Sequence, residues 1–143
     1  MNIPLFPFRT ELYLRPFCKF DVDILKESGL DEGEPHKNSR TDSKFLYYVV
    51  LATNDLPIGF VSFDDKEFTI SYRITEKFQN LGWGTKAVYM LVVLIFATYG
   101  ETILFADIYR DNLASRRVVE KIGFNFWELR QCGAMCLRYR LQI

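Results

Sequence analysis

A glycine-containing segment, residues 79–85 (Gln-Asn-Leu-Gly-Trp-Gly-Thr), has the residue types and spacing of an anion-binding loop. Gly82 and Gly84 allow the main chain to approach a ligand closely and to adopt conformations that a Cβ would forbid. An apolar stretch follows and predicts a helix, whose first N–H groups have no intrahelical partner and lie at the positive end of the helix dipole. The segment therefore predicts a phosphate site built from the backbone. The simpler alternative is a tight turn with glycines at its corners.

Two nucleotide-binding motifs can be compared with this loop. A P-loop needs four residues between its glycines and then Gly-Lys-Ser/Thr, which the segment lacks. The dinucleotide fingerprint fits better, because Gly82-x-Gly84-x-x-Ala87 has its spacing and Glu101 stands where that motif has an acid. The position of the motif argues against a nicotinamide dinucleotide. The motif follows three short predicted strands, and too little chain remains after it to build a doubly wound sheet. Position therefore disfavours this alternative without excluding it.

The composition limits the class of protein. The chain has 143 residues, of which 49% are hydrophobic and 25% charged, and this predicts one globular domain over residues 1–143. The formal net charge is zero, so it gives no reason to expect nucleic acid. Residues 1–71 carry 8 Lys or Arg and 12 Asp or Glu, whereas residues 72–143 carry 10 and 6. This asymmetry is either chance on a solvated surface or a sign that the second half meets an anionic ligand and the first half a cationic one.

Periodicity and turn residues predict ten elements in the order β-α-β-β-β-α-β-α-β-β. Alternating or continuous apolar runs predict strands at residues 10–17, 45–52, 58–63, 68–74, 102–109, 125–130 and 136–141. Helical spacing predicts helices at residues 20–30, 85–99 and 113–122, the last two ended by glycine. The predicted architecture is an α/β sheet protein, antiparallel at first and with parallel pairing around the later helices.

Cysteine, histidine and apolar content argue against several other kinds of site. Cys18, Cys132 and Cys136 are too few for a disulfide framework, and we expect free thiols. The two later cysteines lack the further ligands of a zinc site and His36 has no second histidine nearby, so we expect no metal. The longest apolar stretch, residues 88–97, falls short of the ~20 residues that a membrane helix needs. With no signal-peptide pattern, we expect a cytoplasmic protein.

Two motifs together resemble the signature of a known enzyme family. Gln-x-x-Gly-x-Gly at residues 79–84 follows a strand ending Tyr-Arg-Ile and precedes a long apolar helix. Asn112-x-x-Ser115 is followed by Glu-Lys-Ile-Gly-Phe at residues 120–124. This pair resembles the acetyl-CoA pyrophosphate loop and the later signature of the GNAT N-acetyltransferases. The Asn-x-x-Ser variant is similar to the branch that acetylates protein N-termini, typified by ribosomal-protein N-acetyltransferases, which also holds small-molecule acetyltransferases.

The resemblance covers most of the chain and implies the GNAT acyl-CoA N-acyltransferase fold. That fold is α/β, with a mixed central sheet of about six to seven strands flanked by helices and a splay between the fourth and fifth strands. It also implies acetyl-CoA as the acetyl donor, with its pyrophosphate on the loop backbone and its pantetheine arm along the strand edge at residues 74–76. The donor-binding residues implied are Ile74, Glu76, Gln79, Asn80, Leu81, Gly82, Trp83, Gly84, Thr85, Asn112 and Ser115.

Proton transfer is where the sequence departs from the family pattern. Relatives often carry a Glu at the position of Thr69 or a Tyr at the position of Val119. The remaining candidates for catalytic roles are Glu67, on the same strand face as Thr69, and Ser115, although Glu67 could equally belong to a solvated turn. A weak base suits an α-amine, with a pKa of about 7.7–8.0, better than a lysine near 10.4. Because the Glu and the Tyr of the family pattern are absent at Thr69 and Val119, a non-catalytic acyl-CoA-binding module is the alternative function.

The resemblance implies direct attack of a primary amine on the thioester, without a covalent enzyme intermediate. The expected acceptor is a protein N-terminus or a small-molecule amine, and Tyr72 and Tyr109 are candidates for lining its site. The acidic residues 31–34 belong to a segment that borders the acceptor groove in this family, and their charge suits a cationic amine or basic peptide. We expect no nucleic-acid or membrane partner, and a monomer or homodimer.

Overall fold

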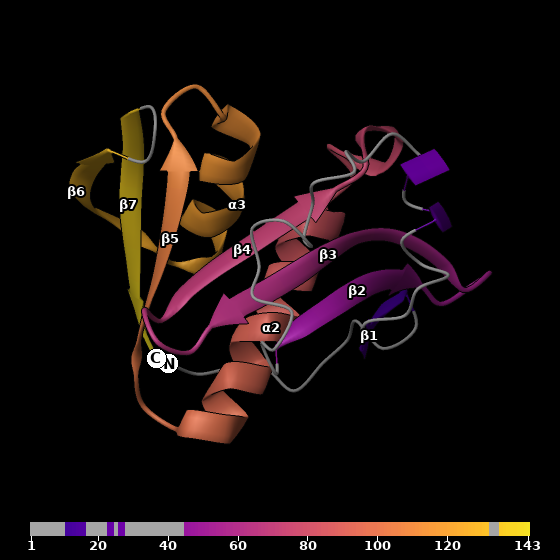
Figure 1. Ribbon diagram of the computed structural model, residues 1–143, viewed down its shortest axis with the longest axis horizontal. Helices are drawn as coiled ribbons and strands as arrows, with labels where there is room; N and C mark the ends of the chain where they lie inside the picture. Colours follow the sequence, from indigo (N-terminus) through magenta and orange to yellow (C-terminus); the bar gives the residue numbers. More distant parts are fainter. Residues whose placement is uncertain (1–10, 17–22, 25, 28–44, 132–134) are drawn as a thin grey trace.

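The computed structural model describes residues 11–16, 23–24, 26–27, 45–131 and 135–143, which form a seven-stranded sheet with helices packed on it (Figure 1). The strands are β1 (Leu12–Pro16), β2 (Leu46–Leu51), β3 (Leu56–Asp64), β4 (Thr69–Ile74), β5 (Ile103–Tyr109), β6 (Asn125–Gln131) and β7 (Met135–Gln142). The helices are η2 (Glu76–Phe78, a 3-10 turn), α2 (Trp83–Tyr99) and α3 (Leu113–Ile122). The strand order in the sheet is β1-β2-β3-β4-β5-β7-β6.

The sheet is divided between β4 and β5. Strands β1 to β4 form an antiparallel meander, and β5 pairs antiparallel with β7. Strands β4 and β5 are parallel, and their ladder contains only the pairs Thr69↔Phe105 and Ile70↔Ala106. Beyond these pairs the two strands separate, and Figure 1 shows them diverging like the arms of a V. The predicted mixed sheet, with a splay between the fourth and fifth strands, is confirmed.

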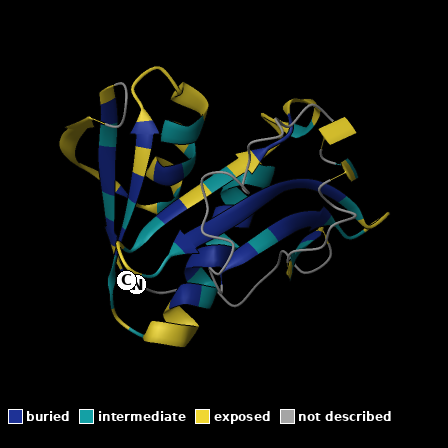
Figure 2. Cartoon of the chain, viewed as in Figure 1, coloured by how far each residue is buried: buried dark blue, intermediate teal, exposed yellow. Residues whose placement is uncertain are grey.

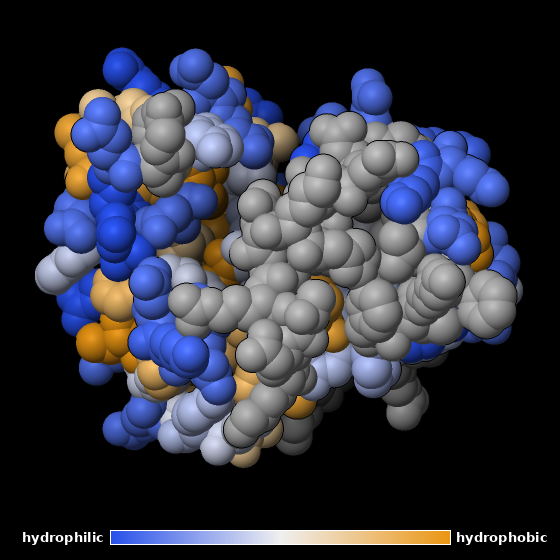
Figure 3. Space-filling view, viewed as in Figure 1, coloured by the Kyte–Doolittle hydropathy of each residue, from blue (hydrophilic) through white to orange (hydrophobic). Residues whose placement is uncertain are grey.

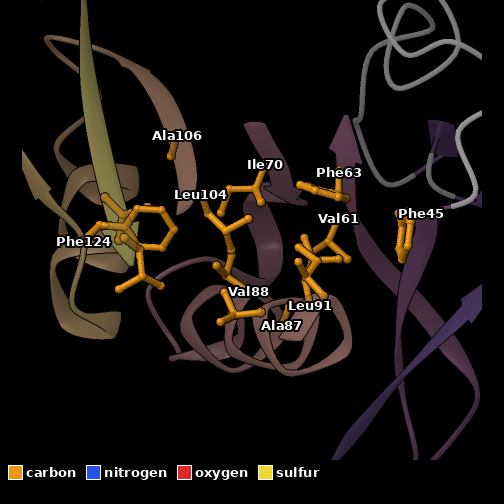
Figure 4. Close-up of a cluster of buried hydrophobic side chains, with 14 of the residues drawn as sticks. Phe45, Val61, Phe63, Ile70, Ala87, Val88, Leu91, Leu104, Ala106 and Phe124 are labelled. Atoms are coloured by element: carbon orange, nitrogen blue, oxygen red, sulfur yellow. The ribbon is translucent and has the colours of Figure 1, made fainter. Parts of the chain in front are cut away.

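Helix α2 packs its apolar side against the sheet and forms most of the core. Its buried side chains include Val88 and Leu91, which Figure 4 shows among side chains of β3, β4 and β5. Gly100 ends the helix at φ 73, with its N–H donating to the Phe96 carbonyl. The helix begins at Trp83, two residues before the predicted start, because Gly82 rather than a later residue occupies the N-cap position. Figure 2 shows that most of β2, most of β3 and the middle of α2 are buried, whereas the C-terminal end of α2 is exposed.

Helix α3 begins and ends where the sequence predicts. The Asn112 side-chain oxygen accepts the Ser115 N–H at 3.1 Å, which caps the first turn. Gly123 ends the helix at φ 119, a left-handed conformation. Val119 lies fully buried in the core. This side of the helix therefore faces the core, where an apolar residue fits.

Strands β3 and β4 approach very closely at the end of the meander. A Cβ on Gly59 would lie 2.1 Å from the Arg73 carbonyl oxygen, a distance no real side chain adopts. The register of β2 against β3 shifts at Val49/Val50, so β3 also carries an irregularity beside this glycine. Thr75 then donates its N–H to the Ile58 carbonyl at 2.8 Å. These contacts fix the end of β4, from which the glycine-containing loop leaves.

Some sequence predictions fall outside the described residues. Residues 23, 24, 26 and 27 are helical, but most of the predicted helix 20–30, the acidic residues 31–34, His36, and the cysteines at 18 and 132 are not described. Cys136 is disulfide-bonded, so the expectation of free thiols is wrong for this residue. None of the helices described is long and apolar enough to cross a membrane.

Candidate functional site

The diverging strands β4 and β5 enclose a cavity of about 190 Å³. It is lined by Ile70, Ser71, Tyr72, Ala106, Asp107, Ile108, Tyr109, Asn112 and Ser115. Figure 3 shows that the surface of the part that holds α3, β5, β6 and β7 mixes hydrophilic and hydrophobic side chains. The cavity therefore occupies the gap that the short β4–β5 ladder leaves open, with the start of α3 across one end.

A half-buried tyrosine, Tyr72, fixes the wall on the helix side of the sheet. Side chains alternate along a strand, so Tyr72 shares a face with Ile70 and Ile74, which belong to the core under α2. Its hydroxyl donates to the Ser115 carbonyl at 2.7 Å and ties β4 to the first turn of α3. Burial raises the pKa of Tyr72 well above its ordinary value, an effect the hydrogen bond to Ser115 only partly offsets. Tyr72 therefore stays protonated as a donor and sets the width of the cavity here.

The wall on the opposite face carries an ion pair that the sequence motifs did not indicate. Arg138 donates from Nε and Nη2 to the two carboxylate oxygens of Asp107, at 2.8 and 2.9 Å. Arg138 is buried, and its guanidinium lies 4.7 Å from the centre of the Phe105 ring. Ser71 and Tyr109 lie on this same face by strand alternation, and Tyr109 is exposed. This wall is polar and built from side chains.

A signal for Asp107 was present in the sequence. It is the one acidic residue of the strand 103–109, otherwise rich in Ile, Leu and Phe. A charged residue in a strand of the central sheet must be paired or must line a site, because burying it alone is costly. Its partner could not be foreseen, since Arg138 lies 31 positions later in the chain and the β5–β7 register brings the two together.

The glycine-containing loop connects η2 to α2 beside the end of β4. Asn80 and Gly82 adopt left-handed backbone conformations, with φ of 60 and 87. The Gln79 side-chain amide donates to the Ile74 carbonyl at 2.8 Å and anchors the loop to the strand. No protein atom lies within 4 Å of the position that a Cβ on Gly82 would take, so the space before the helix N-terminus is open. This arrangement fits a phosphate ester held by backbone N–H groups.

The loop and the cavity are adjacent. A Cβ on Gly84 would meet Val118 of α3 at 3.4 Å and Ile74 of β4 at 3.7 Å, so the first turn of α2 lies against α3 and the end of β4. Lys86 lies 4.9 Å from the centre of the Trp83 ring and forms an ion pair with Glu11. A ligand with a phosphate on the loop could thus extend along the end of β4 toward the cavity.

The structure separates the two predicted catalytic candidates. Ser115 lines the cavity, whereas Glu67 is exposed on the turn at residues 65–68 and is not among the lining residues. Glu67 still lies near enough to Arg138 for its charge to raise the pKa of that guanidinium. Of the other predicted residues, Glu76 and Leu81 are exposed beside the loop. Within the described ranges, no cluster of His, Cys, Asp and Glu could hold a metal ion.

The chain was compared with known proteins. A family model described as "Acetyltransferase (GNAT) domain" matches residues 32–125. No curated protein sequence matches. Among solved structures, an acetyltransferase of the GNAT family from Bacillus anthracis is 22% identical with a TM-score of 0.70, covering 93% of this chain and 94% of its own.

Two further structures are of enzymes named for ribosomal proteins. RimL, a ribosomal L7/L12 α-N-protein acetyltransferase, is 19% identical with a TM-score of 0.69, and the match covers 99% of this chain and 97% of that one. The ribosomal-protein-S5-alanine acetyltransferase from Vibrio fischeri is 18% identical with a TM-score of 0.61, covering 68% and 61%. At these identities the likeness shows the fold alone.

Proposed function

The chain belongs to the GNAT acetyltransferase family, and on that premise we propose that it transfers the acetyl group of acetyl-CoA to a primary amine. The observation that carries the proposal is the cavity in the β4–β5 splay next to an open helix N-terminus. One part suits a phosphate ester, and the other is wide enough for a small reacting group. Acetyl-CoA, when bound, supplies a thioester carbonyl as the electrophile.

The donor side is proposed to be held mainly by main-chain groups. The open space at Gly82 and the first N–H groups of α2 suit the pyrophosphate. The edge of β4 from Ile74 to Glu76 suits the pantetheine arm, in the manner of an added strand. Asn112 and Ser115, which line the cavity, are the proposed contacts of the thioester sulfur and the pantetheine. The remaining donor-binding residues of the proposal are Gln79, Asn80, Leu81, Trp83, Gly84 and Thr85.

The proposed reaction is a direct displacement. The neutral amine nitrogen forms a bond to the acetyl carbonyl carbon, the carbon–sulfur bond breaks, and the sulfur leaves with its electron pair. The nitrogen loses a proton to a base and the sulfur gains one, so an amide and a thiol result. Glu67 is the proposed base, acting through water because of its place on the turn, and Ser115 is the proposed donor toward sulfur. Holding the reactants together supplies much of the rate enhancement.

The acceptor is proposed to be a protein N-terminal α-amine, with a small-molecule amine as the second choice. The absence of an acid at Thr69 and of a tyrosine at Val119 favours an amine that needs little help in losing its proton. The structural likeness to RimL supports the same class. A cytoplasmic location, a monomer or homodimer, and the absence of nucleic-acid and membrane partners remain predictions.

A non-catalytic acyl-CoA-binding module is the alternative, and it rests on the same missing residues. Release of free CoA thiol from acetyl-CoA separates the two. The assay uses peptides with free N-termini, spermidine and an amino sugar as separate acceptors. Amine-dependent thiol release with a mass gain of one acetyl group on the acceptor supports the transferase. Acetyl-CoA binding with no release for any amine supports the binding module.

A further inference from the structure

The cavity has two unlike walls, and their position decides which reactant each one meets. Tyr72, Asn112 and Ser115 lie on the helix side, next to the loop that suits the phosphate ester. Asp107 and Tyr109 lie on the opposite face of the sheet, away from that loop. If the donor enters along the helix side, its acetyl group reaches the gap between the strands from there. The second reactant must then approach from the face that carries Asp107.

Asp107 is held rigidly but keeps capacity for another donor. Its two oxygens each accept one hydrogen bond from Arg138, in the parallel geometry that fixes both partners. A carboxylate offers about four lone-pair sites, so two are left for further donors. The Asp107 side chain is 27% exposed, whereas that of Arg138 is 10% exposed. Asp107 also lines the cavity, so its remaining acceptor capacity is accessible to a donor that enters there.

Further acidic side chains lie near this pair. The pKa of Arg138 is raised, first by its hydrogen bond to Asp107 and further by nearby acidic charge. Besides Asp107, that charge comes from Glu128 on β6 and Glu67 on the β3–β4 turn. Three carboxylates thus contribute negative charge near Arg138, which favours a cation at this wall.

We infer that Asp107 is the anchor for the ammonium group of the acceptor, which would reach the cavity as a primary ammonium cation. The inference rests on the proposed function and names the acceptor-binding residue that the sequence motifs did not supply. Asp107 accepts one ammonium N–H, Arg138 fixes the direction of the carboxylate, and the proton that is later lost leaves from the nitrogen by way of another base. Asp107 is a positioning residue in this account.

The anchor favours one class of primary amine. A carboxylate that is shared with a guanidinium holds a cation well but gains little from taking its proton. The acceptor must then lose its proton to solvent or to a distant base, which is easiest for an amine that titrates near neutrality. An α-ammonium group, with an ordinary pKa of about 7.7–8.0, meets this condition, whereas a lysine side chain near 10.4 does not. The site therefore suits a peptide N-terminus.

The test measures acceptor binding without turnover. Trialanine amide and its N-acetylated form are titrated into protein saturated with CoA thiol, which cannot donate acetyl. A charge-assisted hydrogen bond corresponds to ~10-fold to ~100-fold in affinity, so the wild type should bind the free amine at least ~10-fold more tightly. Asp107→Asn should remove most of this preference, and Arg138→Lys, which keeps the charge but loses the paired geometry, should remove part of it.

Glu101→Gln is the matched control, because Glu101 is an exposed carboxylate at the other end of β5. Melting curves of all variants guard against misfolding, since a merely structural role for Asp107 would lower the melting temperature and leave the ratio between free and acetylated peptide unchanged. A full preference in Asp107→Asn, or no preference in the wild type, overturns the inference.

The thiol-release assay on the same proteins separates this inference from the proposed function. Asp107-dependent binding of the free amine without any acetyl transfer would contradict the proposed function and leave the anchor standing. Acetyl transfer with the same acceptor KM in wild type and Asp107→Asn would contradict the anchor and leave the function standing.

Discussion

The two walls of the splay cavity are built in different ways. The proposed donor side consists of an open loop with left-handed residues at 80 and 82, a helix N-terminus and a capped helix start. The proposed acceptor side consists of side chains, above all the Asp107–Arg138 pair. Backbone groups are the same for every residue type, so the donor side suits one constant ligand. Side chains differ from protein to protein, so we expect the proposed acceptor side to determine which amine this chain selects.

Gly82→Val tests most strongly whether the loop at residues 79–85 binds acetyl-CoA, as the contrast between the two sides requires. A valine there is strained at φ 87 and its side chain projects into the open space before the helix. We expect acetyl-CoA affinity to fall by ~100-fold or more, since several charge-assisted N–H contacts are lost.

Gly100→Val is the matched control for this change. Gly100 has φ 73 and likewise has no protein atom within 4 Å of a Cβ, but it lies at the other end of α2. Calorimetry should show wild-type affinity in this variant and comparable loss of melting temperature in both. Equal loss of acetyl-CoA affinity in the two glycine variants would contradict the proposed role of the loop in binding acetyl-CoA.

The two acidic candidates of the acceptor side can be separated by kinetics. Glu67→Gln should lower kcat by about tenfold, less than the ~10²-fold to ~10⁴-fold typical of a general base, because Glu67 is exposed on a turn. Its acetyl-CoA affinity should stay unchanged, and its acceptor KM should change far less than that of Asp107→Asn. Full turnover in Glu67→Gln would exclude it as the base.

Asn112→Ala tests how the cap supports the donor side. The side chain caps α3 by accepting the Ser115 N–H at 3.1 Å. Its loss should cost about 1 kcal/mol of unfolding free energy and should lower activity severalfold, because Ser115 shifts with the first turn. Chemical denaturation measures the free energy of unfolding, and the thiol-release assay measures the activity. Unchanged activity together with reduced stability would limit Asn112 to a structural role.

Tyr72→Phe should give the smallest effect at neutral pH. The free energy of unfolding should fall by about 1 kcal/mol, because the hydrogen bond to the Ser115 carbonyl is lost. Because burial raises the pKa of the folded-state hydroxyl, the unfolded chain releases its proton first as the pH rises past about 10. The wild type should therefore lose stability through this range more steeply than Tyr72→Phe. Parallel curves of unfolding free energy against pH would contradict this role for the tyrosine.

The contrast between the backbone-built loop and the wall built from side chains also explains what the sequence could and could not predict. The loop, the α3 cap and the stop at Gly123 follow from residues close together in the chain, and the structure has them where expected. The splay followed from the family resemblance. The Asp107–Arg138 pair depends on the register of β5 against β7, which local patterns do not specify. Sequence reasoning also assigned Cys136 a free thiol, because pairing depends on contacts that spacing does not give.

The central claim is that the loop and splay form a site for acetyl-CoA. The most direct test is a calorimetric titration of the wild type with acetyl-CoA, with NAD as the control ligand and Gly82→Val as the control protein. We predict micromolar binding of acetyl-CoA to the wild type, none of NAD, and loss of acetyl-CoA binding in Gly82→Val. Binding of NAD in place of acetyl-CoA, or acetyl-CoA binding that Gly82→Val leaves intact, would contradict the account.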